Sequence, residues 1–156
     1  MTALADLGAR ILRNRRLVRA PIWLYRARAG ALFGSRMLML EHVGRTSGQR
    51  RYVVLEIIDR PREDCFVVAS GFGTTAQWFR NICADPQVRM WIGSRAAAPA
   101  TARVLDQGET DRTLNGYRSR NPRYWEQFRP VLEQTLGRPM GESDIPLPMV
   151  ELRLQP

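Results

Sequence analysis

The amino-acid sequence predicts an α+β protein, mainly β, built on an antiparallel sheet or a small barrel. Six short apolar or β-rich runs are joined by short loops, and few helical patterns lie between them. Parallel strands need long crossover connections, so short loops favour antiparallel pairing. The chain has 156 residues and contains no internal repeat. This length indicates one domain, with room for a terminal appendage.

The first element expected is a basic helix at the N-terminus. Leu4, Leu7, Ile11 and Val18 recur at steps of three, four and seven, which places them on one helical face. Pro21 ends or kinks this helix, and an apolar-aromatic cluster follows it. This pattern is typical either of a membrane-surface anchor or of a helix that packs on the body with a solvated arginine face.

Most of the net charge lies in the same segment. The chain has 24 basic residues, all of them arginine, and 15 acidic residues, for a net charge of +9. Residues 1–40 carry eight arginines and one acid (+7), and residues 41–156 carry 16 arginines and 14 acids (+2). No nucleic acid is expected as a partner, because a nucleic-acid-binding body would itself be strongly basic. Two interpretations of the basic segment stay open: peripheral contact with a membrane surface through residues 1–28, or a helix with a solvated arginine face.

Several classes of function and location are excluded by what the sequence lacks. The absence of lysine excludes a Schiff-base lysine and a P-loop. No uncharged run is long enough for a spanning helix, and the N-terminus has no small-residue cleavage site. A cytoplasmic protein is therefore expected, at the inner face of the membrane if the basic segment acts as an anchor.

Too few metal-ligating side chains are present for a metal site. His42 is the only histidine, and a structural strand residue is its expected role. With one histidine and no clustered cysteines, neither a zinc site nor a histidine-based catalytic triad is expected. Cys65 and Cys83 sit in apolar patterns, which favours reduced core residues.

The body follows in a regular order. Strands are expected over 37–43, 52–58 and 65–69, a helix over 76–84, strands over 88–92 and 100–105, helical structure over 110–137 interrupted at 121–122, and a last strand over 148–154. A polar turn is expected over 44–49 and a charged hairpin loop over 59–64.

Two loops break their strands with small residues. The loop over 44–51 combines two glycines, two hydroxyl side chains and three arginines, so a phosphate or a carboxylate is its natural ligand. The loop over 70–81 feeds a helix whose N-terminus offers unpaired N–H groups. Short Gly/Ser/Arg hairpins are common, so each loop alone is a weak signal.

Taken together, the loops carry four motifs in a fixed order. They are His-x-Gly-Arg-x-Ser-Gly-x-x-Arg over 42–51, Val-x-x-Ser-Gly-x-Gly over 67–73, Trp-Phe-x-Asn over 78–81 and Ala-Asp-Pro-x-Val over 84–88. This order resembles the nitroreductase family of deazaflavin-dependent oxidoreductases, over roughly residues 36–155. The resemblance implies a split β-barrel of about six mostly antiparallel strands with peripheral helices over 36–156, preceded by the basic helical segment over 1–35.

The resemblance also implies a cofactor, coenzyme F-420, with FMN as the less favoured alternative. F-420 has an acidic tail, which an arginine-lined loop would hold. The cofactor-binding residues implied are Gly44, Arg45, Thr46, Ser47, Gly48, Arg50, Arg51, Val53, Ala69, Ser70, Gly71, Trp78 and Asn81. The protein's task would be binding, orientation and exclusion of water, because the cofactor carries the hydride.

The sequence departs from the family pattern at two places near this loop. Thr46 stands where a lysine or arginine is common, and Val53-Val54 replaces a common Thr-Pro. The resemblance implies Tyr124 and Tyr117 as candidate catalytic residues, because tyrosines in this region orient the substrate or deliver a proton in some members, and Ser70 is a further candidate at the end of the third strand. For Tyr117 the alternative is a helix face packed on the barrel, and for Ser70 it is a turn residue at a strand end.

The expected function is reduction of an electron-poor substrate, such as a quinone, a nitroaromatic or an enone, by hydride from reduced F-420. A non-catalytic split-barrel carrier of flavin or lipid is the alternative. The expected partner is a small-molecule electron acceptor, no metal is expected, and the sequence leaves both a monomer and a homodimer open.

Overall fold

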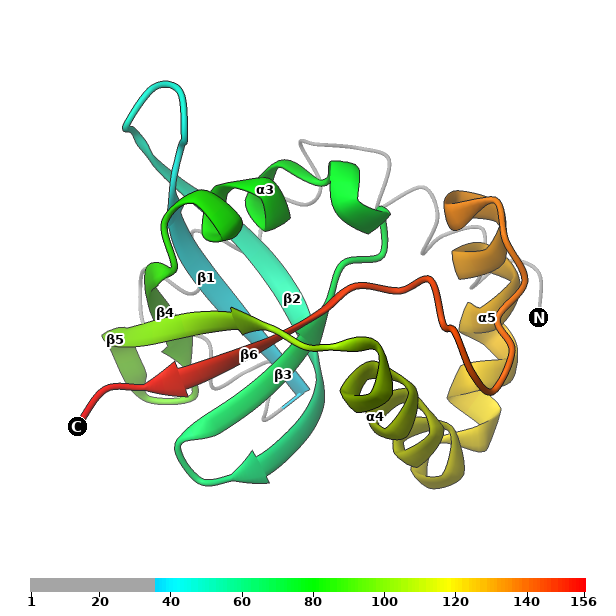
Figure 1. Ribbon diagram of the computed structural model, residues 1–156. Coiled ribbons are helices and arrows are strands. Elements are labelled where there is room, and N and C mark those ends of the chain that lie inside the picture. Colours follow the sequence, from blue (N-terminus) through cyan, green and yellow to red (C-terminus); the bar gives the residue numbers. More distant parts are fainter. Residues whose placement is uncertain (1–35) are drawn as a thin grey trace.

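Six antiparallel strands form a closed barrel in the computed structural model, which describes residues 36–156 (Figure 1). The strands are β1 (Met37–Val43), β2 (Arg50–Arg62), β3 (Cys65–Ala69), β4 (Gln87–Ile92), β5 (Arg95–Val104) and β6 (Met149–Leu154). Their order around the barrel is β1-β2-β3-β6-β5-β4, and pairing of β4 with β1 closes it. The predicted fold class, a six-stranded antiparallel split barrel with peripheral helices, is confirmed for these residues.

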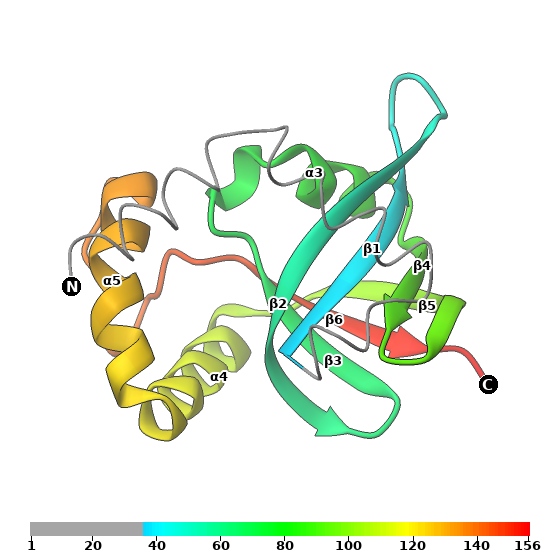
Figure 2. The same cartoon turned by 180° about the vertical axis from the view of Figure 1, so that it is seen from behind.

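The helices occupy two positions around the barrel. A short 3-10 turn, η2 (Gly73–Thr75), leads into α3 (Gln77–Ala84), which lies across one end of the barrel. The pair α4 (Gln107–Arg120) and α5 (Pro122–Leu136) connects β5 to β6. Seen from both sides, this pair stands beside β2 and β3, away from β4 and β5 (Figures 1 and 2). The barrel face of β2 is thereby brought opposite two helices.

Several predicted bounds differ from the structure, among them those of the expected loop over 59–64. Strand β2 continues to Arg62, so only Glu63 and Asp64 form the turn. Its pairing with β3 shifts register between Ile57 and Asp59 and again before Arg62. Such bulges let a charged stretch stay in a strand.

Two other elements begin earlier than expected. Strand β5 starts at Arg95 rather than at residue 100, and α4 starts at Gln107 rather than at residue 110. The cause in α4 is a capping box, in which the Asp106 carboxylate accepts from the Glu109 N–H and the Glu109 carboxylate accepts from the Asp106 N–H.

The barrel interior is filled by alternate strand residues and by the inner face of α3. Its largest members include Leu38, Leu40, Leu55, Phe66, Val68, Trp78, Phe79, Ile82 and Met90. A second cluster lies outside the barrel, under α4 and α5, and includes Leu114, Tyr117, Trp125, Met140 and Met149. Successive side chains of a strand point to opposite faces of the sheet, so where α4 and α5 cover the barrel both the inner and the outer face are buried.

One cysteine lies where the sequence predicted and the other does not. Cys65 is buried on β3, as expected, and it is a free thiol. The prediction that Cys83 is a core residue is wrong, because its side chain is exposed. On α3 the inward positions are taken by Trp78, Phe79 and Ile82, and residue 83 falls on the outer face of the helix.

No helix within residues 36–156 is long and apolar enough to cross a membrane. The predicted N-terminal helix, its aromatic cluster and the membrane contact through residues 1–28 lie outside the described residues.

Candidate functional site

The hairpin between β1 and β2 is held in shape by its own backbone. Gly48, at φ +68°, donates its N–H to the carbonyl of Gly44 at 2.8 Å, and Gly44 donates to the carbonyl of Gln49 at 2.8 Å. A Cβ on Gly44 would lie 2.6 Å from Ser47 Oγ, which accepts from the Gln49 N–H. Three backbone N–H groups of the hairpin are thus engaged internally, and its charge comes from the arginine side chains.

Arg45 ties this hairpin to α3 through Asn81. The Asn81 Oδ1 accepts from the Arg45 backbone N–H at 3.1 Å and from Arg45 Nη1 at 2.9 Å. Arg45 Nη1 also donates to Gln77 Oε1 at 3.0 Å. Asn81 is buried, so it acts as an anchor of the hairpin inside the fold. This contact joins two segments that are 36 residues apart.

His42 completes that anchor. Its Nδ1 lies 3.0 Å from Asn81 Nδ2. Since the Asn81 oxygen accepts from Arg45, the Asn81 amide N–H₂ is the donor and His42 Nδ1 the acceptor. Burial lowers the pKa of His42 to about 4, assisted by the charge of Arg51. His42 is therefore a neutral, buried strand residue.

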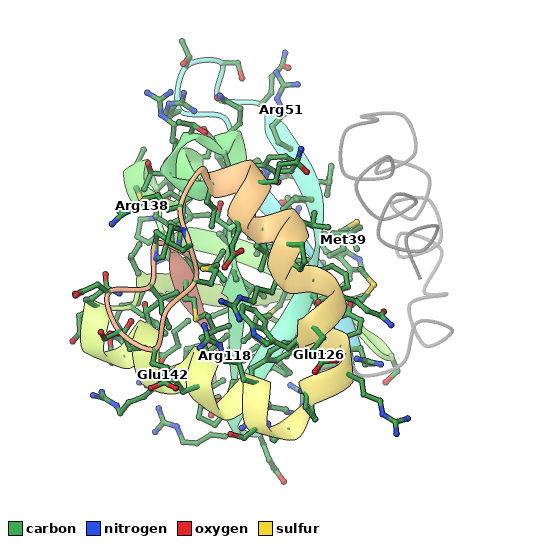
Figure 3. The ribbon with its side chains drawn as sticks, turned by 90° about the vertical axis from the view of Figure 1, so that its right-hand side faces the viewer. Met39, Arg51, Arg118, Glu126, Arg138 and Glu142 are labelled. Carbon is green, nitrogen blue, oxygen red and sulfur yellow. The ribbon has the colours of Figure 1, made fainter. Side chains whose placement is uncertain are left out.

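The remaining hairpin residues stay on the surface. Arg45, Arg50 and Arg51 are all exposed at the same end of the barrel, together with Thr46 and Ser47. Figure 3 shows Arg51 at this end, where β2 begins. Arg50 Nε lies 3.9 Å from the buried Glu41, which Arg89 already binds with two hydrogen bonds of 2.8 and 2.9 Å. The exposed guanidinium groups give this end of the barrel a positive surface.

The turn after β3 contains Ser70 and Gly71, which are also predicted to bind the cofactor. Ser70 is fully buried, and its hydroxyl donates to the Gly73 carbonyl at 2.6 Å while its N–H donates to the Pro148 carbonyl at 2.8 Å. A Cβ on Gly71 would lie 3.6 Å from Leu132 of α5. Ser70 thus fixes the turn, and the turn contacts α5.

Three other residues predicted to bind the cofactor, Trp78, Val53 and Ala69, pack in the hydrophobic clusters. Trp78 is only 8% exposed and meets Phe79 edge to face within the barrel interior. Val53 is partly buried against that same interior. Ala69 packs on the opposite side, in the cluster under α5. Trp78 and Val53 therefore support the barrel, whereas Ala69 faces the helices.

The two candidate tyrosines both contact Glu56, a residue that no sequence motif marks. Tyr117 on α4 donates its hydroxyl to Glu56 Oε1 at 3.1 Å, and Tyr124 on α5 donates to Glu56 Oε2 at 3.3 Å. The two rings lie edge to face, with centroids 6.3 Å apart. Phe128 stacks on Tyr124 with a centroid distance of 4.3 Å, and the Arg36 guanidinium lies 5.2 Å from the Tyr124 ring centre.

Glu56, Tyr117 and Tyr124 form a tyrosine–carboxylate cluster, and burial shifts the pKa of each of them. Burial raises the pKa of Glu56, although the hydroxyl groups and Arg36 oppose this shift. Burial and the neighbouring Glu56 carboxylate raise the pKa of Tyr124 to about 12 and that of Tyr117 further. Both tyrosines are therefore protonated at neutral pH. The one sequence signal for Glu56 was a charge in the middle of an apolar strand.

Helix α5 brings the tyrosines and the turn after β3 together. Its first half supplies Tyr124 and Phe128 at Glu56, and its second half supplies Leu132 and Leu136 beside the turn. The arginine hairpin lies farther along β2. Arg51 and Glu56 are five residues apart on this strand, or about 16 Å. Side chains alternate along a strand, so Arg50 lies on the same face of β2 as Glu56 and Arg51 lies on the opposite face. The basic end and the tyrosine–carboxylate cluster therefore lie along one strand without direct contact.

The exposed arginines are the part of this region whose chemistry suits an anion. Exposed arginines at one end can bind carboxylates or phosphate. Aromatic rings and two hydroxyl groups lie farther along β2, at Glu56.

Solved structures of other proteins share this barrel. An F420-H2 dependent reductase, FDR-A, is 20% identical with a TM-score of 0.52, over 76% of this chain and 94% of that one. A structure described as a domain-swapped dimer is 19% identical with a TM-score of 0.52, over 86% of this chain and 100% of that one. Atu2129 of Agrobacterium tumefaciens, of unknown function, is 17% identical with a TM-score of 0.55, over 88% of this chain and 56% of that one. At these identities the likeness shows the split-barrel fold alone, and no curated protein matches the sequence.

The fold is that of a split barrel. Residues 17–134 match the family model described as F420H(2)-dependent quinone reductase, which covers most of the chain. The protein belongs to this family, and it is an F-420-dependent oxidoreductase. The resemblance found in the sequence motifs is thereby confirmed, and the family is defined by F-420 rather than by FMN.

Proposed function

We propose that this protein reduces a quinone, with reduced F-420 as the hydride donor. The observation that carries the proposal is the arrangement along β2, where exposed arginines stand at one end and two protonated tyrosines share a carboxylate farther along. Membership of a quinone reductase family supports the substrate class. Quinones take up a hydride and a proton, and this arrangement provides for an anionic donor and for the proton.

The hairpin residues bind the acidic end of the cofactor. Arg45 is held on α3 by Asn81, so its position is fixed before binding, whereas Arg50 and Arg51 start β2. Fixed guanidinium groups lose little entropy on binding an anion. Gly44, Thr46, Ser47 and Gly48 shape the loop that presents these side chains.

The ring system of the cofactor binds toward α5 and the turn after β3. Ala69, Ser70 and Gly71 form one wall of this region, and Val53 and Trp78 support it from the barrel interior. F-420, when bound in reduced form, supplies the hydride. Tyr124 donates the proton to the reduced substrate, and Tyr117 holds the same carboxylate from α4.

The test is a turnover assay with purified protein. Oxidation of reduced F-420 should be fastest with menadione, and slower with a nitroaromatic or an enone of similar size. Tight binding of F-420 without turnover on this panel would favour the non-catalytic carrier. Faster turnover of the nitroaromatic or the enone would assign those compounds as the substrate class.

A membrane surface is the location that suits a quinone reductase, because quinones with long side chains are confined to lipid. We propose peripheral contact of residues 1–28 with the cytoplasmic face of the membrane. Seven arginines and one acid in this segment support the proposal, because anionic lipids attract such a segment.

A further inference from the structure

In the tyrosine–carboxylate cluster, the hydroxyl protons of Tyr117 and Tyr124 point toward Glu56 and are not free for a substrate. Both tyrosine hydroxyls donate to Glu56, one to each carboxylate oxygen, at 3.1 and 3.3 Å. A phenol has a single proton, so a tyrosine that donates to Glu56 has no proton left for a substrate. Its oxygen can still accept a hydrogen bond.

Protonation of Glu56 reverses this direction at one of the two tyrosines. A neutral carboxyl group has one O–H donor, and Tyr124 lies within reach of one carboxylate oxygen. When that oxygen donates to the Tyr124 oxygen, the Tyr124 O–H is released to point elsewhere. Tyr117 can continue to donate to the other carboxyl oxygen, so the cluster stays intact.

We propose that Glu56 is the positioning residue that supplies the proton of Tyr124: the protonated carboxyl group turns the Tyr124 O–H toward the substrate and replaces the proton that Tyr124 gives away. The inference rests on the proposed function, which it extends to a residue on β2. Glu56 and Tyr124 are separated by 68 positions in the chain, and they meet because α5 packs on α4, which packs on β2.

The proton and electron count of the step is complete. Reduced F-420, when bound, would supply two electrons as a hydride, and the quinone that accepts it would become a hydroquinone monoanion. The Tyr124 O–H bond breaks and a new O–H bond forms on that anion. The Glu56 O–H bond then breaks as the Tyr124 O–H bond re-forms. Glu56 finally takes a proton from water, and it is partly exposed, which allows this exchange.

The groups around Glu56 oppose one another in their effect on its pKa. Tyr117 faces it from α4, Tyr124 from α5, and Arg36 from the residue before β1. Arg36 and the hydroxyls favour the ionised form, but burial outweighs them and raises the pKa of Glu56. A raised pKa keeps the proton available at a higher pH than an exposed glutamate would.

The experiment compares Glu56→Gln with Glu126→Gln. Glutamine retains the shape of Glu56 but cannot exchange a proton, whereas Glu126 is an exposed residue of α5 that provides the same change of charge (Figure 3). Glu56→Gln should lower kcat by about 100-fold, at the low end of what a general acid contributes. The KM for menadione and the Kd for F-420 should stay within about twofold of wild type, and Glu126→Gln should resemble wild type.

The pH profile separates a proton-supplying role from a merely structural one. In wild type, kcat should fall as the pH rises through the raised pKa of Glu56, and this dependence should be missing in Glu56→Gln. Glu56→Asp keeps a titrating carboxyl group, so it should recover part of kcat together with the pH dependence. If Glu56→Gln folds poorly, the pH profile of Glu56→Asp still tests whether Glu56 supplies the proton.

A measurement without cofactor or substrate completes the test. An acid whose pKa is raised by folding lowers the stability of the native state as the pH rises from its unfolded pKa through its folded pKa. The thermal midpoint of wild type should therefore fall relative to Glu56→Gln as the pH rises from 4 to 8. Wild-type kcat and pH profile in Glu56→Gln, or an equal pH dependence of the two midpoints, would overturn the inference. A wild-type protein that does not oxidise reduced F-420 with any acceptor would overturn the proposed function as well.

Discussion

Asn81 is the side chain on which the arginine hairpin depends. It accepts two hydrogen bonds from Arg45 and donates one to His42, so one buried amide joins β1, the hairpin and α3. An amide can do this because it carries donors and acceptors together, unlike a carboxylate. A buried network in which every member is satisfied fixes a single geometry. The position of Arg45 before ligand binding follows from that geometry.

The neutral state of His42 predicts a loss of stability in acid. Its pKa is lowered to about 4 in the folded protein, against 6.5 when exposed. A group with a depressed pKa stabilises the fold fully above pH 6.5, and this contribution is lost as the pH falls toward 4. The free energy of unfolding should drop by about 3 kcal/mol over this interval from this residue alone.

His42→Asn provides the comparison, because the Asn oxygen can accept the Asn81 N–H without titrating. Urea unfolding at pH 7, 5.5 and 4 should show a smaller drop in the variant than in wild type. Parallel losses in the two proteins would contradict the assignment of His42 as the titrating group.

Arg51 allows a test of cofactor binding at one side chain. It is exposed at the beginning of β2, and we expect it to contact the acidic tail. Arg51→Ala should raise the Kd for F-420 roughly tenfold, as loss of one charge-assisted contact does. Fluorescence titration measures the Kd directly. Arg95→Ala, at an exposed residue of β5, is the control, and an unchanged Kd in Arg51→Ala would remove Arg51 from the site.

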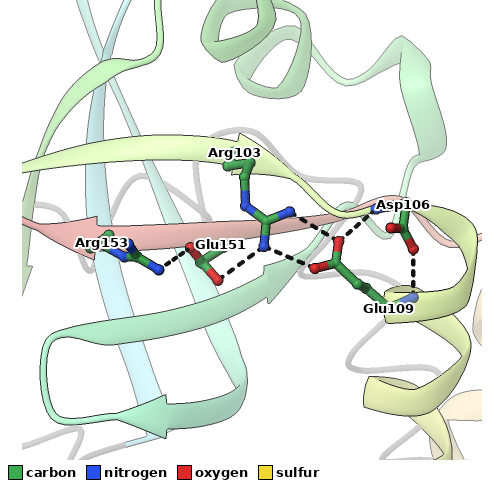
Figure 4. Close-up of polar contacts among 5 residues, drawn as sticks. All are labelled: Arg103, Asp106, Glu109, Glu151 and Arg153. Carbon is green, nitrogen blue, oxygen red and sulfur yellow. Dashed lines mark hydrogen bonds and ion pairs between the residues drawn. The ribbon is translucent and has the colours of Figure 1, made fainter.

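At the scale of elements, the candidate site depends on how α4 and α5 are placed. Helix α4 carries Tyr117, and its N-terminus is fixed by the Asp106–Glu109 capping box (Figure 4). Arg103 of β5 forms two hydrogen bonds of 3.0 Å with Glu109 and one of 3.2 Å with Glu151 of β6. The cap and these exposed ion pairs join the helix to two strands of the barrel.

Asp106→Ala should destabilise the protein by about 1 kcal/mol, because the Glu109 N–H loses its acceptor. For a chain of this size that corresponds to roughly 2–4 °C in Tm. The exposed ion pairs should add little. Asp106→Asn keeps an acceptor oxygen and should stay near wild type in calorimetry. An equal loss in both variants would show that the capping hydrogen bond is not the cause.

At the scale of the whole molecule, the charge is divided between two parts of the chain. Residues 1–40 carry a charge of +7 and the rest carries +2. Replacing Arg10, Arg13 and Arg16 with glutamine should reduce binding to vesicles containing phosphatidylglycerol by about 100-fold. This estimate follows from about 1 kcal/mol per arginine near an anionic surface. Cosedimentation at 0.1 M salt measures the change.

The matched control removes the same charge from the body, at the exposed residues Arg95, Arg123 and Arg138. This variant should still bind vesicles as wild type does. Equal loss in the two variants would indicate attraction by net charge alone. Equal retention in both would contradict the membrane contact.

Much of the fold could be predicted from the sequence because its signals are local. Strands β1 and β3 have the bounds that their apolar runs predict, since each run ends at a turn signal. The extension of β2 could not be predicted, because bulges arise from pairing with β3. The exposure of Cys83 depended on which face of a short helix turned inward.

The candidate site divides in the same way. Its hairpin arginines, its turn after β3 and both tyrosines are recognisable in the sequence, because motifs and residue types identify them. Glu56 is not, since its partners Tyr117 and Tyr124 lie 61 and 68 residues away. The sequence by itself determined the class of fold, the family and the basic hairpin, because these depend on local pattern and residue type. Only the tertiary structure decided which side chains meet at Glu56, because α4 packs on β2 and α5 packs on α4.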